Sequence, residues 1–494
     1  MNQAVSKVVI VGGGTAGWIT AALFTKLLGR KIQLTLVESE QIGIVGVGEA
    51  TIPPIIHLNN ALGIDEKEFL RATKGSIKLG IQFDGWAEGA SYMHAFGGVG
   101  KNYPFCDFHH FWVRARQLGL DIDFWDYSLN YQASINGKFA HLRQLPGTDM
   151  QGIAYAYHFD ANLYAKFLAE RCISHGVQRI EGKISQVVQH PQTGYIESVI
   201  TESGQRVDAD LFIDCSGMHG LLHDKTLNVG FEDWSHWLPC DRAVAVPCEG
   251  RYPAEPFTRS IAREAGWQWR IPLQHRIGNG HVYSSKYMDD ARAQDILLQN
   301  LDGKALSEPR LIKFRTGRRL KQWHKNVVAI GLSSGFLEPL ESTSIHLIQT
   351  AATRLAKLFP HQSIDMQLVE TFNRQSQLEF EQIRDFVILH YKLNTRNDSK
   401  FWRDCRDMEI PATLEEKINL FRHTGRVFRE NDELFSEIAW QQVMIGQGCV
   451  PQDYHPIAAN LDKTQLQDMM KSLQTIIGQT VEKLPPYQQF LDNL

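Results

Sequence analysis

The chain has 494 residues, of which 43% are hydrophobic, and its formal net charge at neutral pH is −4. This length suffices for two or three domains with a sizeable core, and the charge offers no basic field for nucleic acid or an anionic membrane surface. The sequence has no run of about 18 apolar residues, which a membrane-spanning helix would need. Residues 1–7 lack the pattern of an export signal. We therefore expect a soluble, cytoplasmic protein that binds neither nucleic acid nor a membrane.

The first predicted elements are a strand, a glycine turn and a helix. Val8 to Val11 is a β-branched run, Gly12-Gly13-Gly14-Thr15-Ala16-Gly17 follows, and the apolar spacing from Trp18 to Leu28 is helical. A second predicted strand, Gln33 to Val37, ends at Glu38, about twenty residues beyond the glycines. Glycine turns alone are common, but this context predicts a dinucleotide-binding βαβ unit.

Each position of the turn has its own physical role. Gly12 permits the tight turn, Gly14 lets a pyrophosphate approach the backbone, and Gly17 lets the helix pack on the strand. The phosphate should meet the free amides and positive dipole end of the helix that begins near Thr15 and Ala16.

Glu38 predicts the adenosine half of the ligand. Its carboxylate can accept hydrogen bonds from a ribose diol and would repel a 2′-phosphate. We therefore expect an FAD-like or NAD-like rather than an NADP-like ligand.

Later segments extend this module. Residues 160–175 predict a helix, and short alternating strands follow near 187, 196–201 and 206–207 before a buried strand at 211–213. We expect a three-stranded excursion that returns to the parallel sheet. A strand at 326–330 and a helix at 342–359 come next, and the chain beyond about 360 is mostly amphipathic helix, for example Leu378, Phe380, Ile383, Phe386 and Val387.

The segment G-W-Q-W-R-I-P at 266–272 predicts a strand with an unusual face. Because side chains alternate along a strand, Trp267 and Trp269 point to the same side, and Pro272 ends the strand or leaves it at an edge. Two adjacent indoles make a large, rigid surface that excludes water. Ordinary core packing is the alternative interpretation.

Cysteines and histidines indicate no metal site. The seven cysteines are scattered and form no C-x-x-C pair, which predicts reduced thiols. His219 and His223 have i, i+4 spacing but no third ligand or H-E-x-x-H pattern accompanies them. His109 and His110 stand among aromatic residues and are expected in the core.

Several motifs follow one another in a recognisable order. They are G-G-G-T-A-G at 12–17, V-G-V-G-E-A-T-I-P at 45–53, K-L-G-I-Q-F at 78–83, H-A-F-G at 94–97, Y-H-F-D at 157–160, the W-x-W-x-I-P element, and P-L-E-S-T-S at 339–344. Together they resemble the flavin-dependent halogenases of the tryptophan halogenase type. In this resemblance the W-x-W-x-I-P element separates halogenases from related flavin monooxygenases.

The resemblance implies an α/β fold in which an FAD-binding parallel sheet module of the flavin monooxygenase type carries inserted antiparallel sheet segments and a mostly helical C-terminal part. Residues 1–360 would form the FAD-binding module, with substrate-facing segments at about 85–155 and 225–310, and residues 361–494 would form the helical substrate-side part. The residues that would join the glycine turn in binding FAD are Gly48, Glu49, Ala50, Gly331 and Leu340.

The implied activity is FADH2-dependent halogenation. Reduced FAD, supplied by a separate and transiently bound flavin reductase, would react with O2, and bromide or chloride would be oxidised to hypohalous acid. The halogen would pass to an electron-rich aromatic such as indole or a tryptophan-like compound. Trp267 and Trp269 would form the partition that keeps this substrate away from the flavin.

Lys78 and Glu341 are the implied catalytic residues. Lys78 would fix the oxidised halogen beside the substrate ring, as a haloamine or by hydrogen bonding hypohalous acid. Its apolar neighbours predict burial, which lowers the pKa of an amine, whereas a solvated lysine is the alternative. Glu341 would assist Lys78 or remove the ring proton, although a carboxylate at the entrance to a helix can also be a simple cap.

The implied halide and substrate contacts lie nearby in sequence. The amides of Thr343 and Ser344 at a helix start offer a halide site. The family pattern usually has glycine where Ser344 stands, which leaves the preference between chloride and bromide open. His94 and Phe96 would project to one side of an extended segment and sandwich a flat aromatic, with core packing as the alternative.

One part of the family pattern is missing. Tryptophan-specific members carry paired tyrosines and a tryptophan in a C-terminal stretch, whereas the corresponding residues 420–440 contain no tyrosine. A bound zwitterion needs matched buried partners, so we expect a more open site that accepts indole itself or another electron-rich ring. Tyr454, Trp440 and Trp402 are candidates to replace the missing contacts.

Two other functions fit parts of the sequence. A flavin-dependent aromatic monooxygenase would let the substrate reach the flavin and would form product without halide. A flavin-binding redox or sensory protein would need neither Lys78 nor Glu341.

Overall fold

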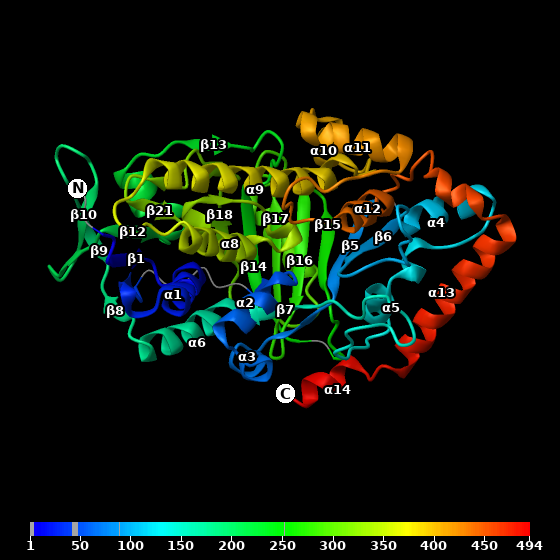
Figure 1. Ribbon diagram of the computed structural model, residues 1–494, viewed down its shortest axis with the longest axis horizontal. Helices are drawn as coiled ribbons and strands as arrows, with labels where there is room; N and C mark the ends of the chain where they lie inside the picture. Colours follow the sequence, from blue (N-terminus) through cyan, green and yellow to red (C-terminus); the bar gives the residue numbers. More distant parts are fainter. Residues whose placement is uncertain (1–3, 42–47, 88, 251) are drawn as a thin grey trace. The chain divides into compact units, whose positions relative to one another are not determined.

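The computed structural model describes residues 4–41, 48–87, 89–250 and 252–494 (Figure 1). Val45 to Val47 of the V-G-V-G-E-A-T-I-P motif therefore lie outside the described residues. The chain divides into two compact units, and each is assembled from three separate segments. The first unit comprises residues up to Gly75, Phe159–Asp241 and Lys313–Glu381, and the second comprises Ser76–His158, Arg242–Ile312 and Gln382–Leu494.

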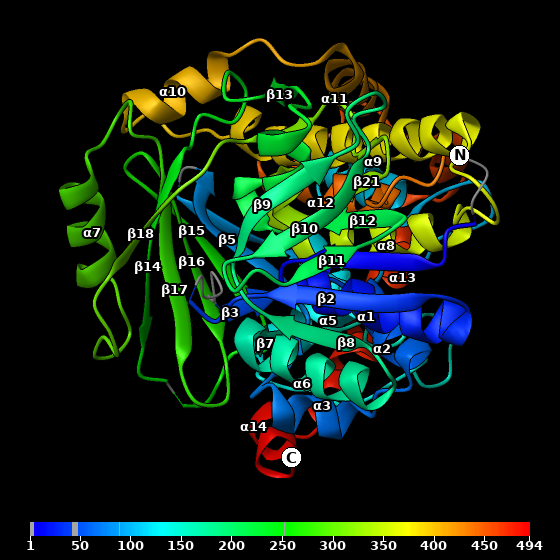
Figure 2. The same ribbon diagram turned by 90° about the vertical axis from the view of Figure 1, so that its left-hand side faces the viewer.

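The first unit is built on a six-stranded sheet, whose strands lie side by side in Figure 2. Its order is β20-β21-β12-β1-β2-β8, and all neighbours pair in parallel except β20 with β21. The strands are β1 (Lys7–Val11), β2 (Gln33–Glu38), β8 (Gln178–Glu181), β12 (Leu211–Asp214), β20 (Trp323–His324) and β21 (Val327–Ala329). Their nearly continuous apolar composition matches a parallel sheet buried on both faces.

Helices and two small sheets complete the first unit. Helix α1 (Thr15–Leu28) packs against α6 (Ala161–Ser174) and α8 (Ser344–Lys357). The expected excursion forms the antiparallel sheet β9-β10-β11, and a further small sheet has the order β13-β19-β22. The remaining elements are β3 (Gly48–Ala50), α2 (Pro54–Leu62), α3 (Glu66–Ala72), β9 (Ile184–Gln189), β10 (Ile196–Thr201), β11 (Arg206–Asp208), β13 (Phe231–Asp233), β19 (Gly317–Arg319) and β22 (Gly335–Phe336).

The second unit is built on a seven-stranded sheet of order β18-β14-β17-β16-β15-β5-β6. Helix α7 (Asp290–Gln299) packs on β14 and β17 of this sheet, as Figure 2 also shows, and α12 (Glu437–Gly446) packs on β6. The strands are β5 (Gly80–Ala87), β6 (Ala90–Ala95), β14 (Arg242–Cys248), β15 (Thr258–Arg263), β16 (Gly266–Pro272), β17 (Ile277–Tyr283) and β18 (Arg310–Lys313). Strand β4 (Ser76–Lys78) pairs antiparallel with β7 (Ala156–Asp160) outside this seven-stranded sheet.

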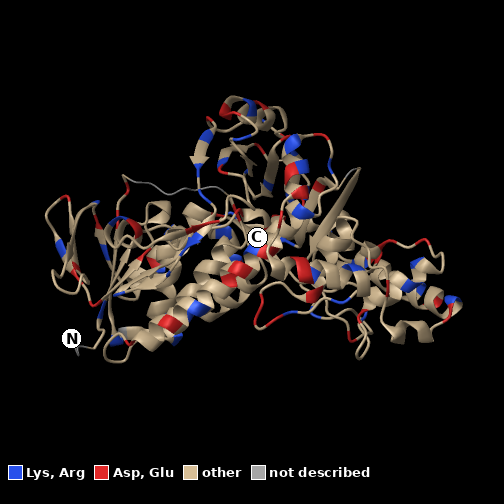
Figure 3. Ribbon diagram, turned by 90° about the horizontal axis from the view of Figure 1, so that it is seen from above, with Lys and Arg blue, Asp and Glu red and all other residues tan. Residues whose placement is uncertain are grey.

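Most other helices also belong to the second unit, and α9 runs through parts of both. They are α4 (Phe108–Gln117), α5 (Leu129–Ile135), α9 (Met366–Lys392), α10 (Lys400–Asp407), α11 (Ala412–Thr424), α13 (Lys463–Lys483) and α14 (Tyr487–Asp492). Figure 3 shows Lys and Arg interspersed with Asp and Glu along the ribbons, in keeping with the small net charge. Within the described ranges, no helix combines the length and the apolar character needed to cross a membrane.

Candidate active site

The glycine turn of the first unit has the predicted geometry. Gly12 has φ +113, and a Cβ there would lie 2.3 Å from the Cys215 carbonyl oxygen, so no other residue fits without displacement. A Cβ at Gly17 would lie 1.9 Å from the Gly12 oxygen, which explains how α1 approaches β1 so closely. A Cβ at Gly14 would meet no atom within 4 Å. The turn is therefore tight on its protein side and open at Gly14.

Two loops meet this turn at the carboxyl edge of the parallel sheet. Gly331 follows β21 with φ +77, and a Cβ there would lie 2.7 Å from the Cβ of Ala16. The Asp214 carboxylate at the end of β12 is buried and accepts hydrogen bonds from the backbone of Ser216, Leu222 and His223. Ligands of open α/β sheets bind in the crevice at this edge. The sequence reasoning identified the strand but missed Asp214 as the anchor of its loop.

Glu38 lies at the end of β2, where an adenosine ribose is expected. One carboxylate oxygen accepts a hydrogen bond from Arg179 Nε, and the other lies where a Cβ at Gly13 would be. Arg179 also binds Glu40 and Glu181. This ion-pair network fixes the Glu38 side chain against the glycine turn.

Glu49 belongs to β3, directly after residues that are not described. Burial raises the pKa of this carboxyl to about 7. The group is therefore partly protonated at neutral pH, which the sequence alone does not predict.

The P-L-E-S-T-S motif forms a tight entry to α8. Leu340 and Glu341 are buried, and Ser342 takes a left-handed conformation with φ +58, which is uncommon for a residue with a side chain. Thr343 is the N-cap of α8. Its side chain accepts no hydrogen bond from the free amides of the first turn, and the first turn contains no acidic residue. The amides of Thr343 and Ser344 therefore stand at a positive helix end without a side-chain cap.

Trp267 and Trp269 lie on β16 as predicted. Both are buried, and their ring centroids are 6.3 Å apart with planes inclined by 60°. Trp269 faces Gly280 across β16 and β17, and a Cβ at Gly280 would lie 2.0 Å from the indole. Among the residues that the structure describes, the buried Trp269 Nε1 has no hydrogen-bond partner.

Lys78 is completely buried on β4 of the second unit. Its Nζ lies 5.4 Å from the centroid of the Phe96 ring, within the range of a cation–π interaction. Lys78 is therefore not a solvated surface lysine, and the structure brings it together with Phe96.

His94 and Phe96 contact each other, but they do not form the predicted sandwich. Their centroids are 6.5 Å apart and their planes are inclined by 78°, an edge-to-face arrangement. Parallel walls are needed to enclose a flat ring on both faces, so the rings are not arranged as expected here, and a role of His94 and Phe96 in substrate binding stays a prediction. The register explains it, because Phe96 lies beyond the end of β6 and its amide donates to Leu79.

Residues 7–463 match the family model for tryptophan halogenase. The chain belongs to the tryptophan halogenase family. Tryptophan 7-halogenase RebH from Lentzea aerocolonigenes is 33% identical, with 99% of each chain covered. Two similar solved structures each have a TM-score of 0.96. The flavin-dependent halogenase Xcc4156 from Xanthomonas campestris is 48% identical, with 99% of this chain and 98% of that chain covered. The flavin-dependent halogenase BrvH from Brevundimonas sp. BAL3 is 43% identical, with 99% of this chain and 100% of that chain covered.

These comparisons confirm the predicted family and fold class and favour a halogenase over an aromatic monooxygenase. The protein is a flavin-dependent halogenase, an oxidoreductase with FAD as cofactor that halogenates an electron-rich aromatic. The first unit fits FAD, because the space at Gly14 is open for a pyrophosphate at the N-terminus of α1. Glu38 and the Gly331 loop would hold the rest of the nucleotide.

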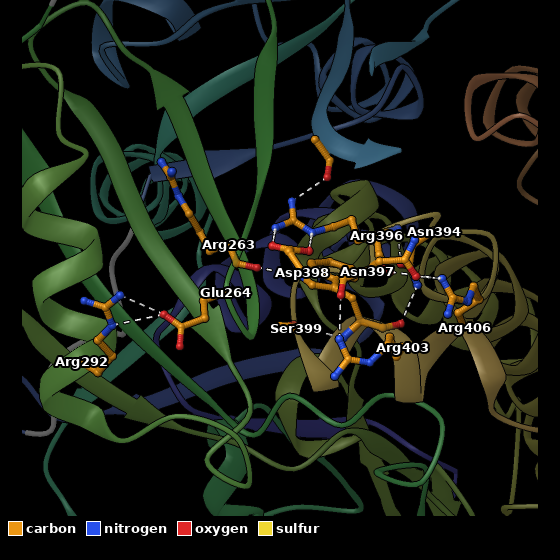
Figure 4. Close-up of polar contacts among 12 residues, drawn as sticks. Arg263, Glu264, Arg292, Asn394, Arg396, Asn397, Asp398, Ser399, Arg403 and Arg406 are labelled. Atoms are coloured by element: carbon orange, nitrogen blue, oxygen red, sulfur yellow. Dashed lines mark hydrogen bonds and ion pairs between the residues drawn. The ribbon is translucent and has the colours of Figure 1, made fainter. Parts of the chain in front are cut away.

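The halogenase keeps two proposed substitute residues in its core. The Trp402 indole N–H donates to Arg263 O, and its ring stacks on Tyr391. Figure 4 shows the contacts that fix this start of α10: Arg396 binds Asp398, and Arg403 and Arg406 donate to the 396–397 segment. Trp440 donates to the buried Glu433, which pairs with Lys417.

Tyr454, the third candidate, accepts a hydrogen bond from Arg114. All three side chains thus have structural partners, which the sequence could not identify.

Two phenylalanines that the sequence reasoning did not assign to the site lie beside His94. Phe386 and Phe435 stack with centroids 3.7 Å apart, and their centroids lie 5.7 and 6.2 Å from that of His94. Phe435 comes from the stretch 420–440 that lacks tyrosine. The presence of phenylalanine in that stretch is the sequence feature from which Phe435 could have been proposed as a neighbour of His94.

Proposed function

We propose that this halogenase uses Lys78 to present oxidised halogen to an aromatic ring next to Phe96 and His94. The burial of Lys78 beside an aromatic ring carries this proposal. An amine held in a water-excluding site can bind hypohalous acid and keep it from escaping into solvent.

Glu341, Thr343 and Ser344 belong to the first unit. We propose that Thr343 and Ser344 bind bromide or chloride through amides at the start of α8, which suits a monatomic anion. We propose Glu341, a buried carboxylate, as a general base of the reaction. FAD, when bound in reduced form, supplies the electrons with which O2 is activated for halide oxidation.

The Trp267 and Trp269 pair is proposed as the partition of the second unit. Two buried indoles exclude water and a bulky aromatic, while the free Trp269 N–H offers one donor to a small polar oxidant. On this proposal the second unit holds the substrate and the first unit holds FAD.

We propose indole, or another uncharged electron-rich ring, as the substrate class. Three phenylalanine rings lie near the His94 ring, and the buried Glu433 and Lys417 neutralise each other. An amino-acid zwitterion would need further matched charges, since an unpaired buried charge is costly.

The remaining partner is a flavin reductase that binds transiently and delivers reduced FAD. Because such a reductase draws on NADH, we place the reaction in the cytoplasm. A diffusible cofactor supply requires no permanent interface between the two enzymes.

The test supplies FAD, a flavin reductase, NADH, bromide or chloride, and indole or free tryptophan, and detects halogen isotope patterns by mass spectrometry. We expect product from the wild type and none from Lys78→Met, which keeps the side-chain length. Lys392→Met, at another lysine of the second unit, whose Nζ binds Met408 O, is the control. Full product yield from Lys78→Met would remove the proposed role, and product from tryptophan alone would refute the substrate class.

A further inference from the structure

The strand that carries Lys78 is held by a buried network of uncharged polar side chains. Strand β4 is only three residues long, and it pairs with β7 so that Ser76 faces His158 and Lys78 faces Ala156. Side chains alternate along a strand, so Ser76, Lys78 and His158 share one face of this ribbon. Ser76, Lys78 and His158 are all essentially inaccessible to water.

His158 bonds to two hydroxyl groups. Its Nδ1 lies 3.0 Å from Ser76 Oγ, and its Nε2 lies 2.8 Å from Oγ1 of Thr258 on β15. Ser76 Oγ donates to the carbonyl of Pro272, the last residue of the W-x-W-x-I-P strand. The network thus joins the lysine strand to the strand that carries the two tryptophans.

A residue from the C-terminal end of the chain completes the network. The Tyr487 hydroxyl on α14 accepts a hydrogen bond of 2.8 Å from the amide of Ile77, next to Lys78. Burial raises the pKa of Tyr487, so its hydroxyl stays protonated and can donate.

The donor and acceptor inventory allows one arrangement of protons. A serine hydroxyl has one proton and two lone pairs. Ser76 gives its proton to the Pro272 carbonyl, so it accepts from His158. His158 must then carry its proton on Nδ1, and its bare Nε2 accepts from Thr258.

This arrangement requires a neutral histidine. Burial, together with the positive charge of Lys78, holds the pKa of His158 well below its usual range. A second proton would displace the Thr258 donor and place a cation beside the lysine. The network therefore fixes Lys78 without adding charge to its surroundings.

We propose that His158 is a positioning residue for Lys78: through Ser76 and Thr258 it clamps β4 to the end of the tryptophan strand and to β15. Tyr487 adds a separate contact to β4 at the amide of Ile77. This inference rests on the proposed role of Lys78 in capturing hypohalous acid. A reacting group displaced by about 1 Å can lose about 100-fold in rate. A loose β4 would therefore lower capture of oxidant without lowering its formation.

The experiment measures two quantities on the FAD-loaded enzyme with reductase, NADH, bromide and indole. One is halogenated indole per O2 consumed, and the other is hypobromous acid released to a diketone trap. For His158→Phe we expect the first to fall at least tenfold while total bromide oxidation, in product and trap together, stays within twofold. His158→Asn, which can still donate to Ser76, should recover part of the coupling.

Two further variants separate positioning from folding. Tyr487→Phe removes one hydroxyl and should lower coupling by a smaller factor in the same direction. His281→Phe changes another buried histidine of the second unit, which bonds to Ala293 O on α7, and should leave coupling unchanged.

The outcomes distinguish this inference from the proposed function. Unchanged coupling in His158→Phe, or an equal loss of product and of total bromide oxidation, would overturn the positioning role while the role of Lys78 stands. Full coupling in Lys78→Met would overturn both.

Discussion

The indole of Trp269 covers the backbone of Gly280, which faces it across β16 and β17. A Cβ at Gly280 would lie 2.0 Å from the ring, so only glycine leaves room for the indole in this position. The tryptophan face of the second unit thus depends on a glycine of the neighbouring strand.

Gly280→Ala should displace Trp269 and weaken the proposed partition. Overpacking of this kind costs about 1–3 kcal/mol, and we expect halogenated product per O2 consumed to fall by about threefold or more. The ratio is measured with an oxygen electrode and mass spectrometry. Gly478→Ala in α13, where a Cβ meets no atom within 4 Å, is the control. An unchanged ratio in Gly280→Ala would show that the indole position is unimportant.

Two glycines of the first unit should separate cofactor binding from stability. At Gly14 an added Cβ meets no protein atom, so Gly14→Ala should fold normally but obstruct the pyrophosphate and weaken FAD binding by about tenfold or more. At Gly17 the Cβ would strike the Gly12 oxygen, so Gly17→Ala should lower stability by about 1–3 kcal/mol or more. Flavin fluorescence titration and thermal unfolding measure the two effects. Equal behaviour of both variants would contradict the distinction.

Local sequence patterns were sufficient to predict the glycine turn of the first unit. The period-two and helical spacings, with Gly12, Gly14 and Gly17 between them, predict β1 and α1 because the contacts that fix the turn are mostly near in sequence. The helical spacing gave a wrong prediction at Leu378. That residue was assigned to one apolar face with Phe380, but its side chain is 41% exposed. Residues two positions apart on a helix are separated by about 200° of rotation and therefore lie on nearly opposite sides.

The surroundings of Lys78 were not accessible to the same reasoning. Burial followed from its apolar neighbours, but Ser76 and His158 are separated by 82 residues, and Ile77 and Tyr487 by 410. No periodicity connects such positions, and their pairing is decided by which strands meet. The same applies to Trp402, whose partner Arg263 is 139 residues away.

Glu49 should make stability depend on pH. Burial raises its pKa to about 7 in the folded protein, so the native state keeps a proton that the unfolded chain has already released. This contribution is complete below the ordinary carboxyl pKa and is lost as the pH rises through about 7, by at most about 3 kcal/mol.

Glu49→Gln should therefore raise the unfolding midpoint relative to the wild type at pH 8 and not at pH 5. Thermal unfolding at both pH values measures the difference. Glu170→Gln, at an exposed position of α6, is the control. A stabilisation by Glu49→Gln that is the same at both pH values would contradict the titration.

Ser344 allows the proposed halide site to be tested by charge. A carboxylate in the first turn of a helix favours the helix by about 0.3–1 kcal/mol. The same carboxylate would repel a halide at the amides of Thr343 and Ser344, by about 3 kcal/mol for charges 5 Å apart at an effective dielectric constant of about 20. Stability and halide affinity should therefore change in opposite directions in Ser344→Asp.

We expect Ser344→Asp to keep or raise the unfolding midpoint while the KM for bromide rises about tenfold or more and FAD affinity is retained. Asn162→Asp places a carboxylate in the first turn of α6, whose first turn also lacks an acidic residue, and should leave the KM for bromide unchanged. Because both variants add the same charge to the same unit, a general electrostatic effect would raise both KM values. A bromide KM that does not respond to Ser344→Asp would place the halide elsewhere than at the start of α8.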